Sequence, residues 1–224
     1  MFKLSLIGPG DINFHYGSLL GLRERRFKLE LERIAKVLSE LNVSLELLPD
    51  KGVCIELAKL YKQVGGKEVI GTVPSDDKTF GVAFLQEYVS TKVNDKNLFD
   101  KIINSGDWFK QDLILGLMGN AIFYLGASPG TEGERNYAVY LYNLLNGYKG
   151  GVEVNGKKIH PEINAGRNFS VFVYSPFLIR GKLPLEDEQY MKKFGIDLIY
   201  IKNPNQLKNK LSKFISSTPL TSSL

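Results

Sequence analysis

Cysteine and histidine are scarce in this sequence. One cysteine, Cys54, and two histidines, His15 and His160, occur among its 224 residues. A single cysteine forms no disulfide within the chain, which favours a reducing compartment, and it supplies no cysteine-based metal cluster. Cys54 falls in an apolar helical pattern and is interpreted as inert packing. The histidines lie outside any H-x-x-x-H or H-E-x-x-H context, so we interpret both as surface or packing residues and expect no metal site.

Long hydrophobic runs are absent as well. No segment reaches the roughly 18 uninterrupted apolar residues that a membrane helix requires. The apolar run at residues 2–7 is only as long as a strand and lacks the hydrophobic region of a signal peptide. We therefore expect a soluble, cytoplasmic protein with no membrane partner.

Common catalytic and cofactor motifs are missing too. There is no G-x-S-x-G nucleophile elbow and no Walker A lysine pattern. Gly8-Pro9-Gly10 follows the first apolar run, but Asn13 stands where a dinucleotide-binding G-x-G-x-x-G motif needs its third glycine. We expect no bound cofactor. Gly8 and Gly10 still leave room for a ligand to approach the backbone.

Charge of one sign does not dominate either. The formal net charge is +5 and the isoelectric point is about 9.1. Most basic residues alternate with acidic ones, as in residues 23–32. This pattern favours a solvated helix face over a nucleic-acid-binding patch, so a nucleic-acid partner is not expected.

What the sequence does contain is a regular alternation of strand and helix patterns. Strand-like runs cover residues 3–7, 43–48, 68–73, 121–125, 170–174 and 197–201, and helical patterns cover residues 27–41, 53–63, 107–118, 132–146 and 204–214. The alternation predicts βαβ units and a mostly parallel sheet, in an α/β Rossmann-like three-layer sandwich. Such a sheet binds ligands outside the carboxyl ends of its strands.

The domain organisation is indicated by the same patterns. We interpret residues 1–215 as one nucleotide- or phosphate-binding domain and residues 216–224 as a flexible tail. Residues 147–169 interrupt the alternation, and Asn155-Gly156 lies there between two short β-like runs. This dipeptide predicts a small β-hairpin insertion. Residues 76–103 are harder to interpret and are expected to hold one or two short helices over a strand end.

The loop Gly-Ala-Ser-Pro-Gly-Thr at residues 126–131 is the most informative feature. It connects a buried strand directly to a helix whose first N–H groups lack partners within the helix and carry partial positive charge. Gly126 and Gly130 let the backbone approach an anion, and the hydroxyls of Ser128 and Thr131 are further donors. The loop has the composition of a phosphate-binding loop. The alternative is a tight turn with a threonine cap.

Two acidic residues, Glu132 and Glu134, fall in the first turn of the following helix. Both are placed to stabilise its positive end. Alternatively, Glu134 faces the cleft as a carboxylate beside a bound sugar. Glu132 is the better candidate for capping alone, and spacing leaves the two roles of Glu134 open.

Three segments together resemble the LONELY GUY and lysine-decarboxylase-like superfamily of Rossmann proteins, which includes the molybdenum-cofactor carrier proteins. GGKEVIGTVP at residues 65–74 resembles its GG-x-viGi-x-P strand, NAIFYL at residues 120–125 its sDAvIal strand, and GTEGE at residues 130–134 its G-T-x-x-E motif. The resemblance covers most of the chain outside residues 147–169. It implies a homodimer that binds a nucleotide-type ligand.

The sequence departs from this family at its catalytic positions. Two glycines of the family's P-G-G-x-G-T run are replaced in residues 126–131. The arginine that phosphoribohydrolase members place before the threonine falls at Gln111, with Lys110 adjacent. In those members the arginine and the motif glutamate, here Glu134, flank the N-glycosidic bond. Glutamine cannot stabilise developing charge as a guanidinium can. The candidate catalytic residues are therefore Glu134, Gln111 and Lys110.

These observations leave three hypotheses. The first is a nucleotide or other phosphate-bearing ligand at the strand ends, with possible hydrolysis of a nucleoside 5′-monophosphate at the base–ribose bond assisted by Glu134. The second is a non-catalytic carrier or sensor of a nucleotide- or pterin-derived ligand. The third, single-strand nucleic-acid binding, is disfavoured by the interleaved acidic residues. In the first hypothesis the phosphate-binding residues are Gly8, Gly10, Gly126, Ser128, Gly130 and Thr131.

Overall fold

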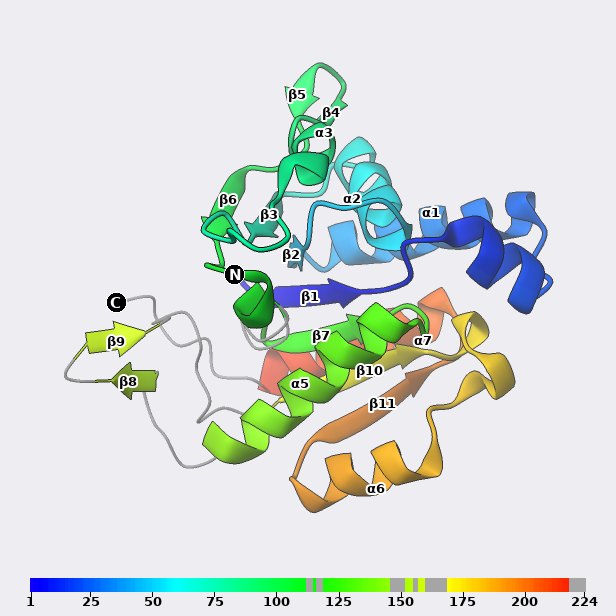
Figure 1. Ribbon diagram of the computed structural model, residues 1–224. Helices are drawn as coiled ribbons and strands as arrows, with labels where there is room; N and C mark the ends of the chain where they lie inside the picture. The colour runs from blue at the N-terminus through cyan, green and yellow to red at the C-terminus, as the bar shows by residue number, and fades with distance from the viewer. Residues whose placement is uncertain (112–114, 116–118, 146–151, 155–156, 160–168, 218–224) are drawn as a thin grey trace.

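A seven-stranded sheet forms the centre of the protein (Figure 1). The computed structural model describes residues 1–111, 115, 119–145, 152–154, 157–159 and 169–217. Across the sheet the strands are β11 (Asp197–Ile201), β10 (Ser170–Tyr174), β7 (Ala121–Tyr124), β1 (Lys3–Ile7), β2 (Ser44–Leu47), β3 (Glu68–Val73) and β6 (Lys101–Asn104). Every neighbouring pair in this sheet is parallel, which confirms the predicted α/β class.

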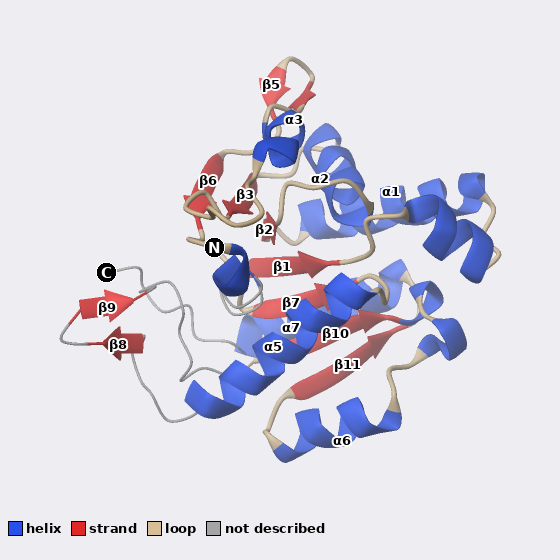
Figure 2. Cartoon of the chain, viewed as in Figure 1, coloured by secondary structure: helices blue, strands red, loops and turns tan. Residues whose placement is uncertain are grey.

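Helices cover both faces of the sheet and complete three layers (Figure 2). One face carries α1 (Glu24–Glu40), α2 (Val53–Gln63) and α7 (Pro204–Ser217), and the other carries α5 (Pro129–Leu145) and α6 (Leu185–Lys193). Side chains alternate along each strand. In β1, Leu4 and Leu6 therefore enter the core under α1 and α2, whereas Ile7 enters the core under α5. The predicted Rossmann-like sandwich is confirmed.

Residues 76–104 contain the short helices that the sequence predicted and three strands that it did not. The helices are η2 (Ala83–Leu85) and α3 (Gln86–Val89), followed by a small hairpin of β4 (Lys92–Val93) and β5 (Lys96–Asn97). The chain then adds β6 to the edge of the main sheet, beside β3. Only two apolar residues lie in β6, and three of its four residues are exposed. An edge strand this short gives a weak sequence pattern.

Two helical segments were also absent from the predicted pattern. A π-helix, η1 (Asn13–Leu19), lies between β1 and α1, so α1 begins at Glu24 rather than at residue 27. The charged helix α6 precedes β11 and is preceded by two short 3₁₀ turns, η3 (Ser175–Phe177) and η4 (Ile179–Gly181). Helix α6 buries only Met191, which leaves no apolar period to detect.

The insertion and the C-terminal segment are described in part. β8 (Val152–Val154) and β9 (Lys157–Ile159) form the predicted antiparallel hairpin, while Asn155, Gly156 and His160 lie outside the described residues. Helix α7 continues to Ser217, beyond the predicted end of the closing helix. None of the helices in the described residues is long and apolar enough to cross a membrane.

Candidate functional site

The strand order changes direction between β1 and β7. On one side of β1 lie β2, β3 and β6, and on the other side lie β7, β10 and β11. In open parallel sheets the loops diverge at such a switch point and leave a crevice outside the carboxyl ends of the strands. The two glycine loops predicted from the sequence come directly after the two strands that flank this switch point.

A cavity of about 160 Å³, the switch-point cavity, lies at this crevice. The loops after β1, β2 and β7 contribute its walls, together with the first turns of α2 and α5. Its lining residues are Leu6, Gly8, Gly10, Leu48, Asp50, Lys51, Cys54, Leu115, Ser128, Gly130, Thr131 and Glu134. The structure thus brings six of the predicted site residues into one cavity: Gly8, Gly10, Ser128, Gly130, Thr131 and Glu134.

Helix α5 begins inside this cavity wall with a reciprocal cap. The backbone N–H of Ser128 donates to Thr131 Oγ1 at 2.6 Å, and the Thr131 hydroxyl lies 3.0 Å from the Ser128 carbonyl oxygen. The N–H of Glu132 donates to the same carbonyl at 2.9 Å. Ser128 is therefore the N-cap and Pro129 the first helical residue, a position that proline favours. The threonine cap, expected from the sequence as the alternative to phosphate binding, is present, and Ser128, Gly130 and Thr131 also line the cavity.

Gly126 does not line the cavity. It packs instead against His15 and Pro9. It is buried with φ of 150°, and a Cβ there would lie 2.7 Å from His15 Nε2 and 3.0 Å from Pro9 Cδ. His15 is itself buried and donates from Nε2 to the Phe177 carbonyl oxygen at 3.0 Å. The close approach of this packing histidine requires glycine at position 126.

The two remaining candidate catalytic residues point elsewhere. Gln111 is fully buried, donates from Nε2 to Thr72 Oγ1 at 2.6 Å, and accepts a hydrogen bond from the Ser105 hydroxyl. Exposed Lys110 forms an ion pair with Asp107 at 2.9 Å. Neither residue lines the switch-point cavity. Leu115, in the same segment, does line it.

Glu134 and Cys54 lie close together in the cavity wall. Burial raises the pKa of the Cys54 thiol well above its usual value, and the nearby negative charge of Glu134 raises this pKa further. The thiol therefore stays protonated at neutral pH, in agreement with its interpretation as inert. The sequence did not indicate that Cys54 would contact the site.

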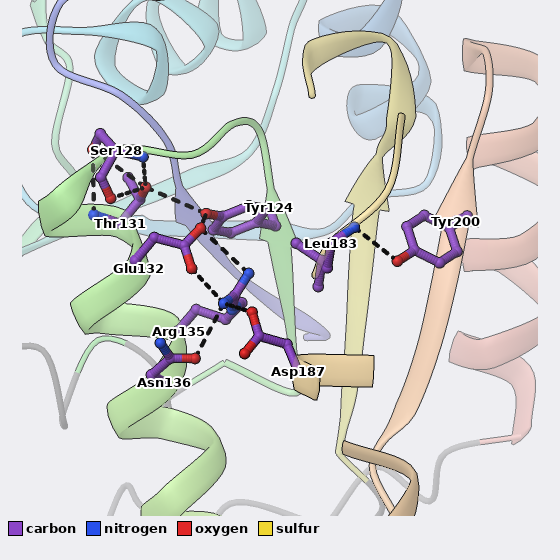
Figure 3. A network of polar contacts seen from close by, with 9 residues as sticks. All are labelled: Tyr124, Ser128, Thr131, Glu132, Arg135, Asn136, Leu183, Asp187 and Tyr200. Carbon is purple, nitrogen blue, oxygen red and sulfur yellow. Dashed lines mark hydrogen bonds and ion pairs between the residues drawn. The ribbon is translucent and has the colours of Figure 1, made fainter. Parts of the chain in front are cut away.

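A polar network fixes the far side of α5 (Figure 3). Arg135 is fully buried, forms ion pairs with Glu132 and Asp187, and places its guanidinium carbon 5.2 Å from the centre of the Tyr124 ring. The Tyr124 hydroxyl donates to Glu132. Burial and this hydrogen bond raise the pKa of Tyr124 well above its usual value. Glu132 thus has a role in tying α5 to β7 and α6, in addition to the capping role expected of it.

Sequence reasoning overlooked Arg135. The available signal was its spacing of three residues from Glu132, which places the two side chains on one face of a helix. A buried arginine needs carboxylate partners, and its second partner, Asp187, lies 52 residues away on α6. That pairing depends on the tertiary fold.

A larger cavity, the α1–α2 groove, adjoins the first and has a volume of about 590 Å³. It lies between α1 and α2 and is bounded by the loop after β1. Gly10 and Lys51 line both cavities. The described residues contain no group of three or more histidine, cysteine or acidic side chains arranged to hold a metal ion.

Comparisons with known proteins find similarity of structure but not of sequence. No protein-family model matches the chain, and no curated protein matches it significantly. The molybdenum cofactor carrier protein of Chlamydomonas reinhardtii superposes with a TM-score of 0.55 at 15% identity, over 96% of this chain and 99% of that one. The crystal structure of TM1055 gives a TM-score of 0.55 at 15% identity, over 95% and 99%.

The molybdenum cofactor binding protein of Rippkaea orientalis is also similar. It gives a TM-score of 0.53 at 13% identity, over 96% of this chain and 97% of that one. Identities this low establish the fold alone. The resemblance that the sequence motifs indicated is thereby confirmed for the fold.

Proposed function

We propose that this protein binds a phosphate-bearing small molecule, of the nucleotide or pterin-derived class, in the switch-point cavity. The observation that carries the proposal is the convergence of two glycine loops and the N-terminus of α5 on one cavity between β1 and β7. Helix N-termini attract anions through their N–H groups and their dipole. In α5 the cap engages the N–H groups of Ser128, Thr131 and Glu132, and Pro129 has none, which leaves the Gly130 N–H and the helix dipole to attract an anion. Gly130 has no side chain, and apart from its chain neighbours and the backbone of its own helix no atom lies within 4 Å of the position of its missing Cβ.

A non-catalytic carrier or sensor is the better supported of the two roles. Phosphoribohydrolysis in the resembled family depends on an arginine at the position of Gln111. Here that side chain is buried and hydrogen-bonded at both ends of its amide, to Thr72 and Ser105. Two of the structurally similar proteins are described as carrying or binding the molybdenum cofactor, so this cofactor is a candidate cargo.

Hydrolysis of a nucleoside 5′-monophosphate is the second candidate. Glu134 supports it, because this residue lines the cavity from the second turn of α5, six residues after the N-cap Ser128. In this role Glu134 would assist departure of the base or position a water molecule. We further propose that residues 1–215 act as a single domain, as a homodimer, in the cytoplasm.

Incubation with AMP and related monophosphates tests both roles at once. Protein melting temperature and free base are measured together in the wild type, in Glu134→Ala and in the exposed control Glu186→Ala. A rise in melting temperature without base release supports a carrier or sensor. Base release that is lost only in Glu134→Ala establishes hydrolysis. The proposal is contradicted if the melting temperature does not change and no base is released, both with the monophosphates and with the molybdenum cofactor.

A further inference from the structure

The switch-point cavity is too small for a complete nucleotide-sized ligand. Ligand pockets in proteins typically have volumes of roughly 300–1,000 Å³, whereas this cavity holds about 160 Å³. It suffices for a phosphate group and the atoms next to it. The remainder of a ligand anchored there must extend into neighbouring space.

The α1–α2 groove offers that space. Its volume of about 590 Å³ falls within the range of ligand pockets. Its floor is apolar and is formed by Phe27, Leu31 and Leu60. Phe27 and Leu31 are 5% and 1% exposed, so they belong to the packed core and give the groove a fixed base.

Lys51 lies at the junction of the two cavities. Its side-chain carbons Cγ and Cε come within 3.8 and 3.9 Å of the position of a Cβ on Gly10, so the lysine lies across this glycine. The Lys51 N–H donates to its neighbour Asp50 at 2.7 Å. Lys51 Nζ forms no ion pair with any residue that the structure describes. Its charge is therefore available to an anion that spans the junction.

The charges along the groove restrict the part of the ligand that lies beyond the phosphate. The four acidic residues of the groove outnumber its two lysines: Asp11, Glu24, Glu32 and Glu56 against Lys28 and Lys51. Glu24 pairs with Lys28 at 2.6 Å, and Glu56 pairs with Lys59 at 2.7 Å. Asp11, which accepts the Phe14 N–H at 2.9 Å, and Glu32 form no ion pair within the part of the chain that the structure describes, so their charges repel a second anionic group.

We propose that the α1–α2 groove is a second subsite for the same ligand, with Lys51 as a positioning residue between the two cavities. The ligand class is a molecule with one phosphate joined to an uncharged, partly apolar body. The phosphate binds at the switch-point cavity and the body lies over Phe27 and Leu60. This inference rests on the proposed phosphate binding and adds the location and character of the rest of the ligand.

The test compares AMP with inorganic phosphate as probes in isothermal titration calorimetry. Leu60→Trp fills the groove from α2, and Glu32→Trp fills it from an exposed position on α1 that leaves the core untouched. We expect both variants to bind AMP about tenfold more weakly, a loss of about 1.4 kcal/mol, and to bind inorganic phosphate as the wild type does. Lys51→Ala weakens both probes, whereas the control Lys67→Ala, outside both cavities, weakens neither.

Failure of the inference and failure of the proposed function give different results. If the wild type binds both probes and Glu32→Trp retains wild-type affinity for AMP, the groove is not a subsite and the inference is overturned, while phosphate binding stands. If the wild type binds neither probe, the phosphate site itself is wrong and the inference falls with it. Val64→Trp, at the exposed end of α2, controls for the added indole.

Discussion

Gln111 Nε2 donates a hydrogen bond to Thr72 Oγ1 at 2.6 Å, and both side chains are fully buried. The Ser105 hydroxyl completes the arrangement by donating to Gln111 Oε1. One amide thereby joins β3, the segment after β6 and the segment that begins at residue 107. Gln111 has a structural role in this protein at the position where the resembled hydrolases carry an arginine.

Replacing Gln111 with alanine should destabilise the protein. Thr72 and Ser105 would each lose a buried partner, and leaving a buried polar group unsatisfied costs about 1–3 kcal/mol. Urea unfolding measures the free energy of unfolding. Gln63→Ala, on the exposed end of α2, is the matched control and should lie within about 0.5 kcal/mol of the wild type. Equal effects of the two variants would show that the network contributes nothing.

Gly130→Ala should separate stability from binding. Beyond its chain neighbours and the backbone of its own helix, no atom lies within 4 Å of the new methyl group. Alanine in place of a helical glycine stabilises by up to about 1 kcal/mol. The methyl group would, however, project at the cavity that Gly130 lines. We expect a higher melting temperature together with weaker AMP binding. A variant that is stabilised and binds AMP normally would remove Gly130 from the site.

Gly126→Ala should lower the stability of the protein, in contrast to Gly130→Ala. The φ of 150° and the contact of 2.7 Å with His15 Nε2 leave no place for a Cβ. Alanine at an incompatible φ destabilises by more than about 1 kcal/mol. Chemical unfolding of the Gly126 and Gly130 variants side by side makes each the control of the other, and a neutral Gly126→Ala would contradict the packing described.

Arg135→Met should loosen α6 from α5. The variant keeps an unbranched apolar side chain in place of the aliphatic part of arginine but removes the guanidinium, which leaves Glu132 and Asp187 without their buried partner. Because these carboxylates are partly exposed, we expect a loss of about 3 kcal/mol, at the low end for a broken buried ion pair. Arg33→Met, at an exposed and weakly paired position, should change the free energy of unfolding by less than about 0.5 kcal/mol. Similar losses in both variants would argue against the network.

The raised pKa of Tyr200 predicts that the protein loses stability in alkali. Burial and the hydrogen bond to Glu188 raise the pKa of Tyr200 from 10.0 to about 12. The folded state therefore holds a proton that the unfolded state loses, so this stabilisation is complete below pH 10 and disappears as the pH rises through about 12. The melting temperature of Tyr200→Phe should fall less steeply across that window than that of the wild type. Tyr190→Phe, at an exposed tyrosine, should keep the wild-type slope.

Cys54 provides a spectroscopic report on the switch-point cavity because it is the only cysteine. Its raised pKa predicts slow reaction with a thiol reagent such as DTNB. Glu134→Gln should accelerate the reaction, since removing the negative charge lowers the pKa of the thiol. AMP should slow it in the wild type by covering the cavity wall. Reaction that is insensitive to both changes would contradict the placement of Cys54 beside Glu134.

The sequence predicted the parts of the fold whose signals are local. Six strands of the main sheet carry strong apolar runs, and the glycine loops after β1 and β7 stand out by composition. The η1 π-helix, α6 and β6 were missed because short or highly charged segments bury too few side chains to produce a period. Contacts between residues in separate helices and strands could likewise not be predicted from the sequence.

The residues of the candidate site likewise fall into those that local sequence identifies and those that only the tertiary fold places. Gly8, Ser128 and Glu134 were identifiable from their own loops and helix. Lys51 reaches the cavity only because β2 lies next to β1, which puts the ends of both strands at one edge. Gln111 was placed in the site by its alignment with a family position, but its orientation is set by Thr72, 39 residues away. A local sequence pattern does not contain the position of a partner that is so far away in the chain.

The central place of β1 in the sheet also determines how the chain assembles during translation. β1 pairs with β2 on one side, but on the other side it pairs with β7, and Lys3 finds its partner Asn120 at a separation of 117 residues. One edge of β1 therefore stays open on the ribosome until residues 121–124 have emerged. Exposed strand edges mispair and aggregate. The pairing of β1 with β7 joins residues 117 positions apart, as Leu4 and Ala121 are, and contacts of such long sequence separation form slowly during folding.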